Sequence, residues 1–404
     1  MASVDTTIGH STNGHGAGAE IAVENPATGA VIAHVADSSA AKVAELATLG
    51  RAAQPGWQAL GFDGRARVML ALRKWLMDHA DEVASTIVSE TGKTYEDAYM
   101  AELIYTGGAI TFWAKHAEGF LADEPVSVST VAVAGKKLVT RYEPVGLVGI
   151  IGPWNYPLVN SFGDAIPALM AGNSVILKPS EITPLTSLLL ADALVECGLP
   201  ANVFQVATGR GATGSALIDE ADMLMFTGST STGKKVMARA AQTLTPVSLE
   251  LGGKDPMIVL ADADLERAAN AAAYYSMFNG GQTCISIERV YVEAPIYDDF
   301  VQRVVSKVQA LRQGASTSPG TVESPVSAGS GAMTCTRAVT GGSRVSQGRR
   351  IRSASTPARS SPIGRGSPSS FSMVASWSTT FRHSAAAGLG SSTASVLMPS
   401  RCDG

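Results

Sequence analysis

Between residues 145 and 251 the chain repeats one pattern, in which a short apolar run is followed by a glycine- or proline-containing turn and then by a longer mixed segment. The runs are VGLVGII, SVILKP, VFQVA, MLMFTG and PVSLEL. Strands that are apolar on both faces and alternate with helices are typical of a parallel sheet covered by helices on both sides. We therefore predict an α/β fold for this region, with a ligand site at the carboxyl ends of its strands.

The turn after the apolar run LMF reads FTGSTSTGKKV over residues 226–236, with glycines at 228 and 233. It is close to the phosphate loop G-x-x-x-x-G-K-[ST], but Lys235 stands where that loop carries its Mg²⁺-binding hydroxyl. We expect a helix to begin near Lys234, with backbone N–H groups available for phosphate or pyrophosphate. The turn alone leaves open an ATP site, a dinucleotide site and a purely structural role.

The segment VSVSTVAVAGKKLVTRYEP, residues 126–144, alternates apolar and polar residues on both sides of Gly135-Lys136. Such alternation around a turn predicts a β-hairpin. The hairpin could be an arm that pairs with another subunit.

Composition changes abruptly after Gly314. Of the last 90 residues, 22 are Ser, none is Lys and two are acidic, and we find neither helical nor strand periodicity. A natural disordered tail is one interpretation. We favour another, a GC-rich coding sequence read out of frame, because Arg, Ser, Gly, Pro and Ala rise together at one point.

Charge and cysteine usage exclude several classes of function. Up to Gly314 there are 22 basic and 33 acidic residues, a net charge of 22 − 33 = −11, which disfavours nucleic acid as a partner. No basic-then-apolar leader and no membrane-length apolar run is found, so we expect neither secretion nor a membrane. The four cysteines lack C-x-x-C spacing, which predicts no metal site and no disulfide framework and fits a reducing cytoplasm.

Cys284 lies in FNGGQTCISIERVYVE, residues 278–293, after a glycine pair and before an apolar, strand-like run. A sharp bend at the glycines would leave its thiol exposed, whereas Cys197, in the helical segment ADALVECG, is typical of an inert core cysteine. A nucleophilic cysteine needs a lowered pKa and a nearby acid–base group. Taken alone, Cys284 is compatible with a nucleophile or with a packing residue.

Two further segments carry groups that such a nucleophile would need. Glu250, in SLELGGKDP, ends a strand-like run at a glycine turn, where its carboxylate can reach a cleft or simply be solvated. The rigid loop GPWNYPL, residues 152–158, presents Asn155, whose amide can donate to an oxyanion or cap a turn.

Taken together and in this order, GPWNYPL, AGNSVILKPSEITPL, FTGSTSTGKKV, LELGGKDP and FNGGQTCISIERV resemble the NAD(P)-dependent aldehyde dehydrogenase superfamily. The resemblance covers residues 22–312. It implies a Rossmann-type parallel-sheet cofactor domain followed by a second α/β catalytic domain, which is incomplete here. It also implies a homo-oligomer and a small-molecule aldehyde as substrate. A P-loop ATPase is disfavoured, since neither a Mg²⁺-binding acid nor a hydroxyl at Lys235 supports it.

The resemblance assigns roles to individual residues. Cys284 is implied as the nucleophile, Glu250 as the general base, and Asn155 with the Cys284 backbone N–H as the oxyanion hole. The residues implied to bind the cofactor are Ile151, Trp154, Lys178, Glu181, Gly228, Ser229 and Gly233. Because a carboxylate at Glu181 would repel the 2′-phosphate of NADP, NAD is the expected cofactor and NADP the alternative.

The family's Glu-x-Phe-Gly-Pro motif and its later catalytic segments are not found after Gly314. Two functions therefore stay open: an aldehyde-oxidising oxidoreductase, and a catalytically inactive remnant that at most binds dinucleotide. The expected organisation is a disordered tail over 1–20, a dinucleotide-binding domain over 21–122 and 145–251, a hairpin arm over 123–144, a partial catalytic domain over 252–314, and a low-complexity, disordered or frame-shifted tail over 315–404.

Overall fold

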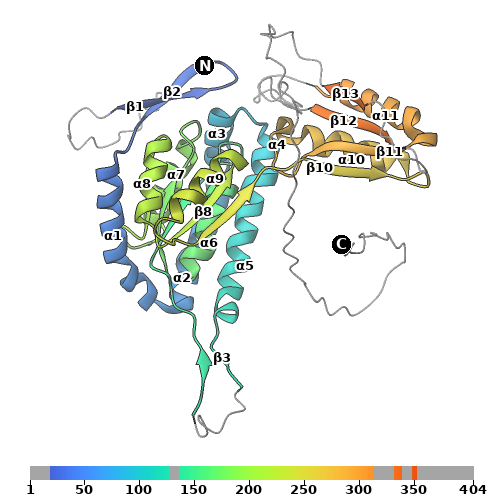
Figure 1. Ribbon diagram of the computed structural model, residues 1–404. Helices are drawn as coiled ribbons and strands as arrows, with labels where there is room; N and C mark the ends of the chain where they lie inside the picture. Colours follow the sequence, from blue (N-terminus) through green and yellow to red (C-terminus); the bar gives the residue numbers. More distant parts are fainter. Residues whose placement is uncertain (1–18, 128–135, 313–331, 339–347, 353–404) are drawn as a thin grey trace. The chain divides into compact units, whose positions relative to one another are not determined.

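The computed structural model describes residues 19–127 and 136–312, and the backbone of two further strands at 332–338 and 348–352 (Figure 1). Nearly all of the expected N-terminal tail lies outside the described residues, as does most of the segment 315–404.

A five-stranded parallel sheet confirms the α/β fold, and each of the five apolar runs supplies one strand. We call it the first sheet. Its strand order is β7-β6-β5-β8-β9, so the chain builds outward from β5 in one direction and then returns to extend the sheet in the other. In open α/β sheets, such a reversal point is where ligands bind, beyond the carboxyl ends of the strands. The strands are β5 (Leu147–Ile151), β6 (Ser174–Lys178), β7 (Phe204–Val206), β8 (Met223–Gly228) and β9 (Val247–Leu251).

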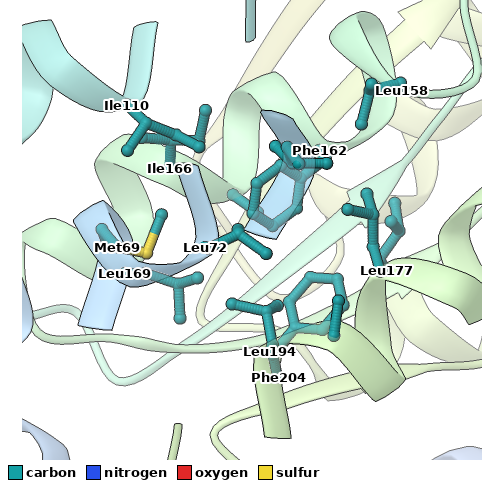
Figure 2. Packing of buried hydrophobic residues seen from close by; sticks show 14 of the residues in the cluster. Met69, Leu72, Ile110, Leu158, Phe162, Ile166, Leu169, Leu177, Leu194 and Phe204 are labelled. Carbon is teal, nitrogen blue, oxygen red and sulfur yellow. The ribbon is translucent and has the colours of Figure 1, made fainter. Parts of the chain in front are cut away.

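Side chains of the first sheet alternate between two buried layers. Val148 and Leu177 belong to one hydrophobic cluster. It includes Phe162 and Phe204, whose rings pack edge to face with their centroids 5.6 Å apart (Figure 2). Leu147 belongs to a second cluster on the opposite face. Fully burying each such side chain stabilises the fold by about 1.5–3 kcal/mol. The first layer is formed with α2 (Gly61–Asp78), α3 (Ala80–Thr91), α5 (Tyr105–Phe120), α6 (Val159–Met170) and α7 (Leu185–Glu196), and the second with α1 (Ala40–Ala59), α8 (Gly211–Glu220) and α9 (Thr230–Ala240).

Two smaller features flank these layers. An antiparallel pair, β1 (Glu20–Asn25) and β2 (Ala30–Ala36), begins the described chain. After α3, the short helix α4 (Tyr95–Asp97) leads into a π-helical segment, Ala98–Ile104, which continues as α5. Single π-helical turns of this kind are frequent at functional sites.

Where the hairpin was expected, β3 (Glu124–Pro125) pairs antiparallel with β4 (Val139–Thr140). Glu124 pairs with Thr140, a register that a tight turn at Gly135-Lys136 would not give. The tip, 128–135, lies outside the described residues, and the role as a subunit arm stays a prediction.

A second sheet has the order β10-β11-β12-β13, parallel except for the last pair. Helices α10 (Leu265–Met277) and α11 (Tyr297–Gln309) pack on it through a cluster that includes Val290 and Phe300. Two of its strands lie where we expected no regular structure. The short run AMTCTRA lies within a Ser-, Gly- and Arg-rich segment and shows no strand pattern of its own. It forms β12, and its backbone pairs with β11. The strands are β10 (Asp255–Val259), β11 (Ile287–Glu293), β12 (Ala332–Ala338) and β13 (Gly348–Arg352).

Candidate active site

A cavity of about 910 Å³ lies at the carboxyl ends of the first sheet and extends to residues 281–284. The strand register brings these ends level: Ile151 pairs with Lys178 on β6 and with Phe226 on β8, and Glu250 pairs with Thr227. Nine of the ten site residues expected from the sequence line this cavity: Ile151, Trp154, Asn155, Lys178, Glu181, Gly228, Ser229, Glu250 and Cys284.

Gly233, the tenth expected residue, is not among the residues that line the cavity. It lies inside α9, because that helix begins at Thr230 rather than near Lys234. Ser229 is the N-cap and accepts from the backbone N–H of Thr232, which starts the helix early. A Cβ at Gly233 would lie 2.6 Å from Leu251, so this glycine allows close packing between α9 and β9.

The loop after β5 is held tightly against its surroundings. A Cβ at Gly152 would lie 2.0 Å from the hydroxyl of Ser161, so only glycine fits this close approach to α6. Further along, the carbonyl of Trp154 accepts from the hydroxyl of Thr183 at 3.3 Å, which links the loop to the segment after β6.

Asn155 is fixed at both its side chain and its carbonyl. Its Nδ2 donates to the carbonyl of Gln282 at 2.7 Å, two residues before Cys284. Its own carbonyl accepts from Lys93 Nζ at 2.9 Å and from Asn279 Nδ2 at 3.2 Å. The loop carrying Asn155 is thereby attached directly to the loop carrying Cys284.

The segment before Cys284 has an unusual backbone. Asn279, Gly280 and Gly281 have φ values of 50°, 63° and 74°, a left-handed conformation that glycine adopts freely and Asn tolerates. This bend confirms the turn expected at the glycine pair. It leaves Cys284 half-buried, in the cavity wall.

The surroundings of Cys284 raise the pKa of its thiol. Burial is the main cause, and the negative charge of Glu250 adds to it, while backbone N–H groups at Cys284 and Ile285 act in the opposite direction. The thiol form is therefore favoured at neutral pH. Cys197, by comparison, packs against the hydrophobic core, as expected, and burial raises its pKa as well.

Glu250 is exposed on β9 and lines the cavity. A second carboxyl group lies near enough to interact with it: burial, together with the charge of Glu250, raises the pKa of Asp164 to about 6. Carboxylates with unlike environments are a recurring feature of acid–base sites.

Lys178 ends β6 and is buried, with Nζ donating to the carbonyl of Pro179 at 2.7 Å and lying 3.7 Å from the Glu181 carboxylate. Burial lowers the pKa of Lys178, and Glu181 opposes that shift. Both residues line the cavity.

Sequence reasoning missed the start of α8, where Gly211, Gly214 and Ser215 line the cavity. A Cβ at Gly214 would lie 3.4 Å from the side chain of Lys178. The glycines in TGRGATGS were the available signal. Lys235, interpreted as a solvated helix residue, is exposed but also lines the cavity.

Two kinds of feature are absent from the described residues. No group of three or more His, Cys, Asp or Glu side chains there could hold a metal ion. No helix in the same ranges has the length and apolar character needed to cross a membrane.

Comparison with known proteins decides the family. The model of the aldehyde dehydrogenase family matches residues 13–355. The chain belongs to the aldehyde dehydrogenase family. It is 38% identical over 295 residues to the 4,4′-diapolycopene aldehyde oxidase of a Methylomonas species, covering 73% of this chain and 56% of that protein. It is 37% identical over 299 residues to the betaine aldehyde dehydrogenase of Vibrio vulnificus strain CMCP6, covering 74% and 60%.

Solved structures of related proteins support the same family assignment. PnpE, from Pseudomonas sp. WBC-3, in complex with nicotinamide adenine dinucleotide has a TM-score of 0.73 at 33% identity, covering 76% of this chain and 62% of that one. An NADP-dependent enzyme of E. coli gives 0.73 at 33%, covering 76% and 63%. The chain thus spans about 56–60% of the length of the two sequence relatives above.

Proposed function

We propose that this protein oxidises an aldehyde to a carboxylic acid, with a nicotinamide dinucleotide as the hydride acceptor. The observation that carries the proposal is the convergence of Asn155, Glu250 and Cys284 on one cavity. These groups can supply an oxyanion donor, a base and a nucleophile, and they come from three segments far apart in the sequence.

The residues around the cavity fit a dinucleotide. The starts of α8 and α9 border it, and backbone N–H groups at helix starts suit a pyrophosphate. Lys178 and Glu181 would meet the adenosine ribose, and the Glu181 carboxylate favours NAD over NADP. Related structures include an NAD complex and an NADP-dependent enzyme, which supports this cofactor class. When bound, the dinucleotide supplies the acceptor for a hydride.

The chain's own residues would act in two stages. Cys284 thiolate adds to the aldehyde carbon, and the resulting alkoxide is stabilised by the Asn155 amide and the Cys284 backbone N–H. Loss of hydride from that carbon leaves a thioester on Cys284. Glu250 then takes a proton from water, which attacks the thioester, releases the acid and restores the thiolate.

The raised pKa of Cys284 gives this proposal a pH dependence. Since only the thiolate adds to an aldehyde, kcat/KM should rise as pH increases through the neutral range.

The test compares the unmodified chain with the variants Cys197→Ala and Cys284→Ala. A short aldehyde is used as the substrate, because the names of the two relatives contain different aldehydes. Absorbance of the reduced nicotinamide should increase for the unmodified chain and for Cys197→Ala, and should not increase for Cys284→Ala. Equal signals for all three would exclude catalysis by Cys284. Dinucleotide binding without turnover would instead support the inactive alternative.

A further inference from the structure

Lys93 lies between α3 and α4 with 1% of its side chain exposed, and it is not among the residues that line the cavity. Its ammonium forms a salt bridge with Glu102, donates to the Asn155 carbonyl at 2.9 Å and lies 4.1 Å from the centre of the Tyr156 ring. Removing one member of a buried ion pair is strongly destabilising, because it leaves the other charge without compensation. A lysine in such a place is therefore held in one position.

Glu102 extends this contact to the start of α6. It lies in the π-helical segment and is fully buried. One carboxylate oxygen binds Lys93, while the other accepts from the backbone N–H groups of Leu158 at 2.8 Å and Val159 at 3.3 Å. Glu102 thus caps α6 from another helix, so the ion pair holds both the middle and the end of the loop that carries Asn155.

The same short segment also reaches the Cys284 loop. Asp97, four residues after Lys93, is half-buried near Asn279, the residue with a φ of 50°; burial raises the pKa of its carboxyl to about 6, and the backbone of Asn279 acts in the opposite direction. The side chain of Asn279 donates to the carbonyls of Asn155 at 3.2 Å and Gln282 at 3.3 Å.

The two loops are also joined directly to each other. The hydroxyls of Tyr156 and Thr283 lie 2.9 Å apart, and Thr283 is the residue immediately before Cys284. The ring of Tyr156 is the one that Lys93 contacts.

We propose that Lys93 and Glu102 are a positioning pair, which holds Asn155 where its amide can serve the reaction at Cys284. This inference rests on the proposed function. An oxyanion donor contributes to rate only if its place is fixed before the charge develops, and Lys93 fixes the backbone of the same residue whose side chain would donate.

A double-mutant cycle tests the coupling through kcat. Lys93→Met should lower kcat on the order of 100-fold, the loss expected for a displacement of about 1 Å. Dinucleotide affinity should stay unchanged. In the Asn155→Ala background the same change should have little further effect, since its target is gone. An equal factor in both backgrounds would show that Lys93 acts only on general stability and would overturn the proposal.

A second measurement does not need turnover. Iodoacetamide alkylation of each cysteine peptide, followed by mass spectrometry, reports how well the Cys284 loop is held, with Cys197 as an internal reference. Lys93→Met should raise the Cys284-to-Cys197 rate ratio several-fold. Glu90→Gln, which alters another buried glutamate that caps a helix, should leave the ratio unchanged. An unchanged ratio in Lys93→Met would contradict the proposal.

The alkylation ratio tests the positioning role even if the proposed function fails or the single variant does not fold. If the unmodified chain oxidises no aldehyde, the proposed function fails and the alkylation ratio alone decides the positioning role. If Lys93→Met does not fold, the double variant Lys93→Met/Glu102→Gln removes both buried charges and keeps a side-chain acceptor for α6, and the same ratio is measured on it.

Discussion

The first and second sheets differ in how many of their faces are covered. The first sheet is buried on both sides, with Val148 and Leu147 in opposite layers. In the described residues of the second sheet, Val290 is buried beneath helices while Ile258 is 70% exposed on β10. Most cavity residues belong to the strands, loops and helices of the first sheet, whereas Cys284 lies on the loop that leads into the second sheet. The side of the cavity formed with the first sheet should therefore tolerate substitutions that the side carrying Cys284 does not.

The largest expected effect comes from a matched pair of core variants. We call the first sheet with its helices the first region, and the second sheet with α10 and α11 the second region. Phe162 in the first region and Phe300 in the second are both fully buried, and truncation to Ala should cost each region about 3–5 kcal/mol. Trp57, Trp75, Trp113 and Trp154 lie in the first region, and Trp377 lies outside the described residues. With Trp377 changed to Phe in every variant, tryptophan fluorescence in urea follows the first region. Phe162→Ala should shift this transition and Phe300→Ala should not. Equal shifts would show that the two regions unfold as one.

A smaller effect on stability is expected at two helix caps, of which one is buried and the other exposed. Glu90 caps α7 through the N–H groups of Leu185 and Thr186, and burial raises its pKa to about 7 from an ordinary 4.5. A raised carboxyl pKa stabilises the fold below pH 4.5, and this contribution is lost as pH rises towards 7. The loss amounts to roughly 3 kcal/mol.

The matched variants for this effect are Glu90→Gln and Asp264→Ala. Glu90→Gln should flatten the decrease in stability between pH 4.5 and 7, measured by urea unfolding at each pH. Asp264, an exposed cap of α10 in the second region, should cost about 1 kcal/mol when changed to Ala. A pH profile that Glu90→Gln leaves unaltered would assign the decrease to other groups, of which Asp97 and Asp164 act in the same direction.

The smallest expected effect concerns the open face of the second sheet. Ile258→Ser should change the free energy of unfolding by less than about 0.5 kcal/mol, as is usual for exposed sites. Val290→Ser, on the covered face of the same sheet, should be far more damaging. Comparable losses for the two, measured by calorimetry, would show that something covers Ile258 in solution.

The sequence predicted what depends on local pattern. Apolar runs located the five strands, and glycines marked the bend before Cys284. What it could not predict depends on partners distant in the chain: Glu102 caps a helix 56 residues away, and Glu90 caps one 95 residues away. The start of α9 was misplaced because Ser229 begins the helix before the lysines. Strand β12 was missed because its partner, β11, lies outside its own segment.

The π-helical segment Ala98–Ile104 makes the joint between α4 and α5 sensitive to chain length. A π-helical turn holds about one residue more than an α-helical turn. If the same seven residues formed an α-helix instead, the extra residue would not be absorbed, and every following side chain of α5 would turn by about 100° around the helix axis. Ile110 would leave the core while Glu102 lost its place beside Lys93. One backbone irregularity thus keeps the packing of a long helix and the support of Asn155 in register with each other.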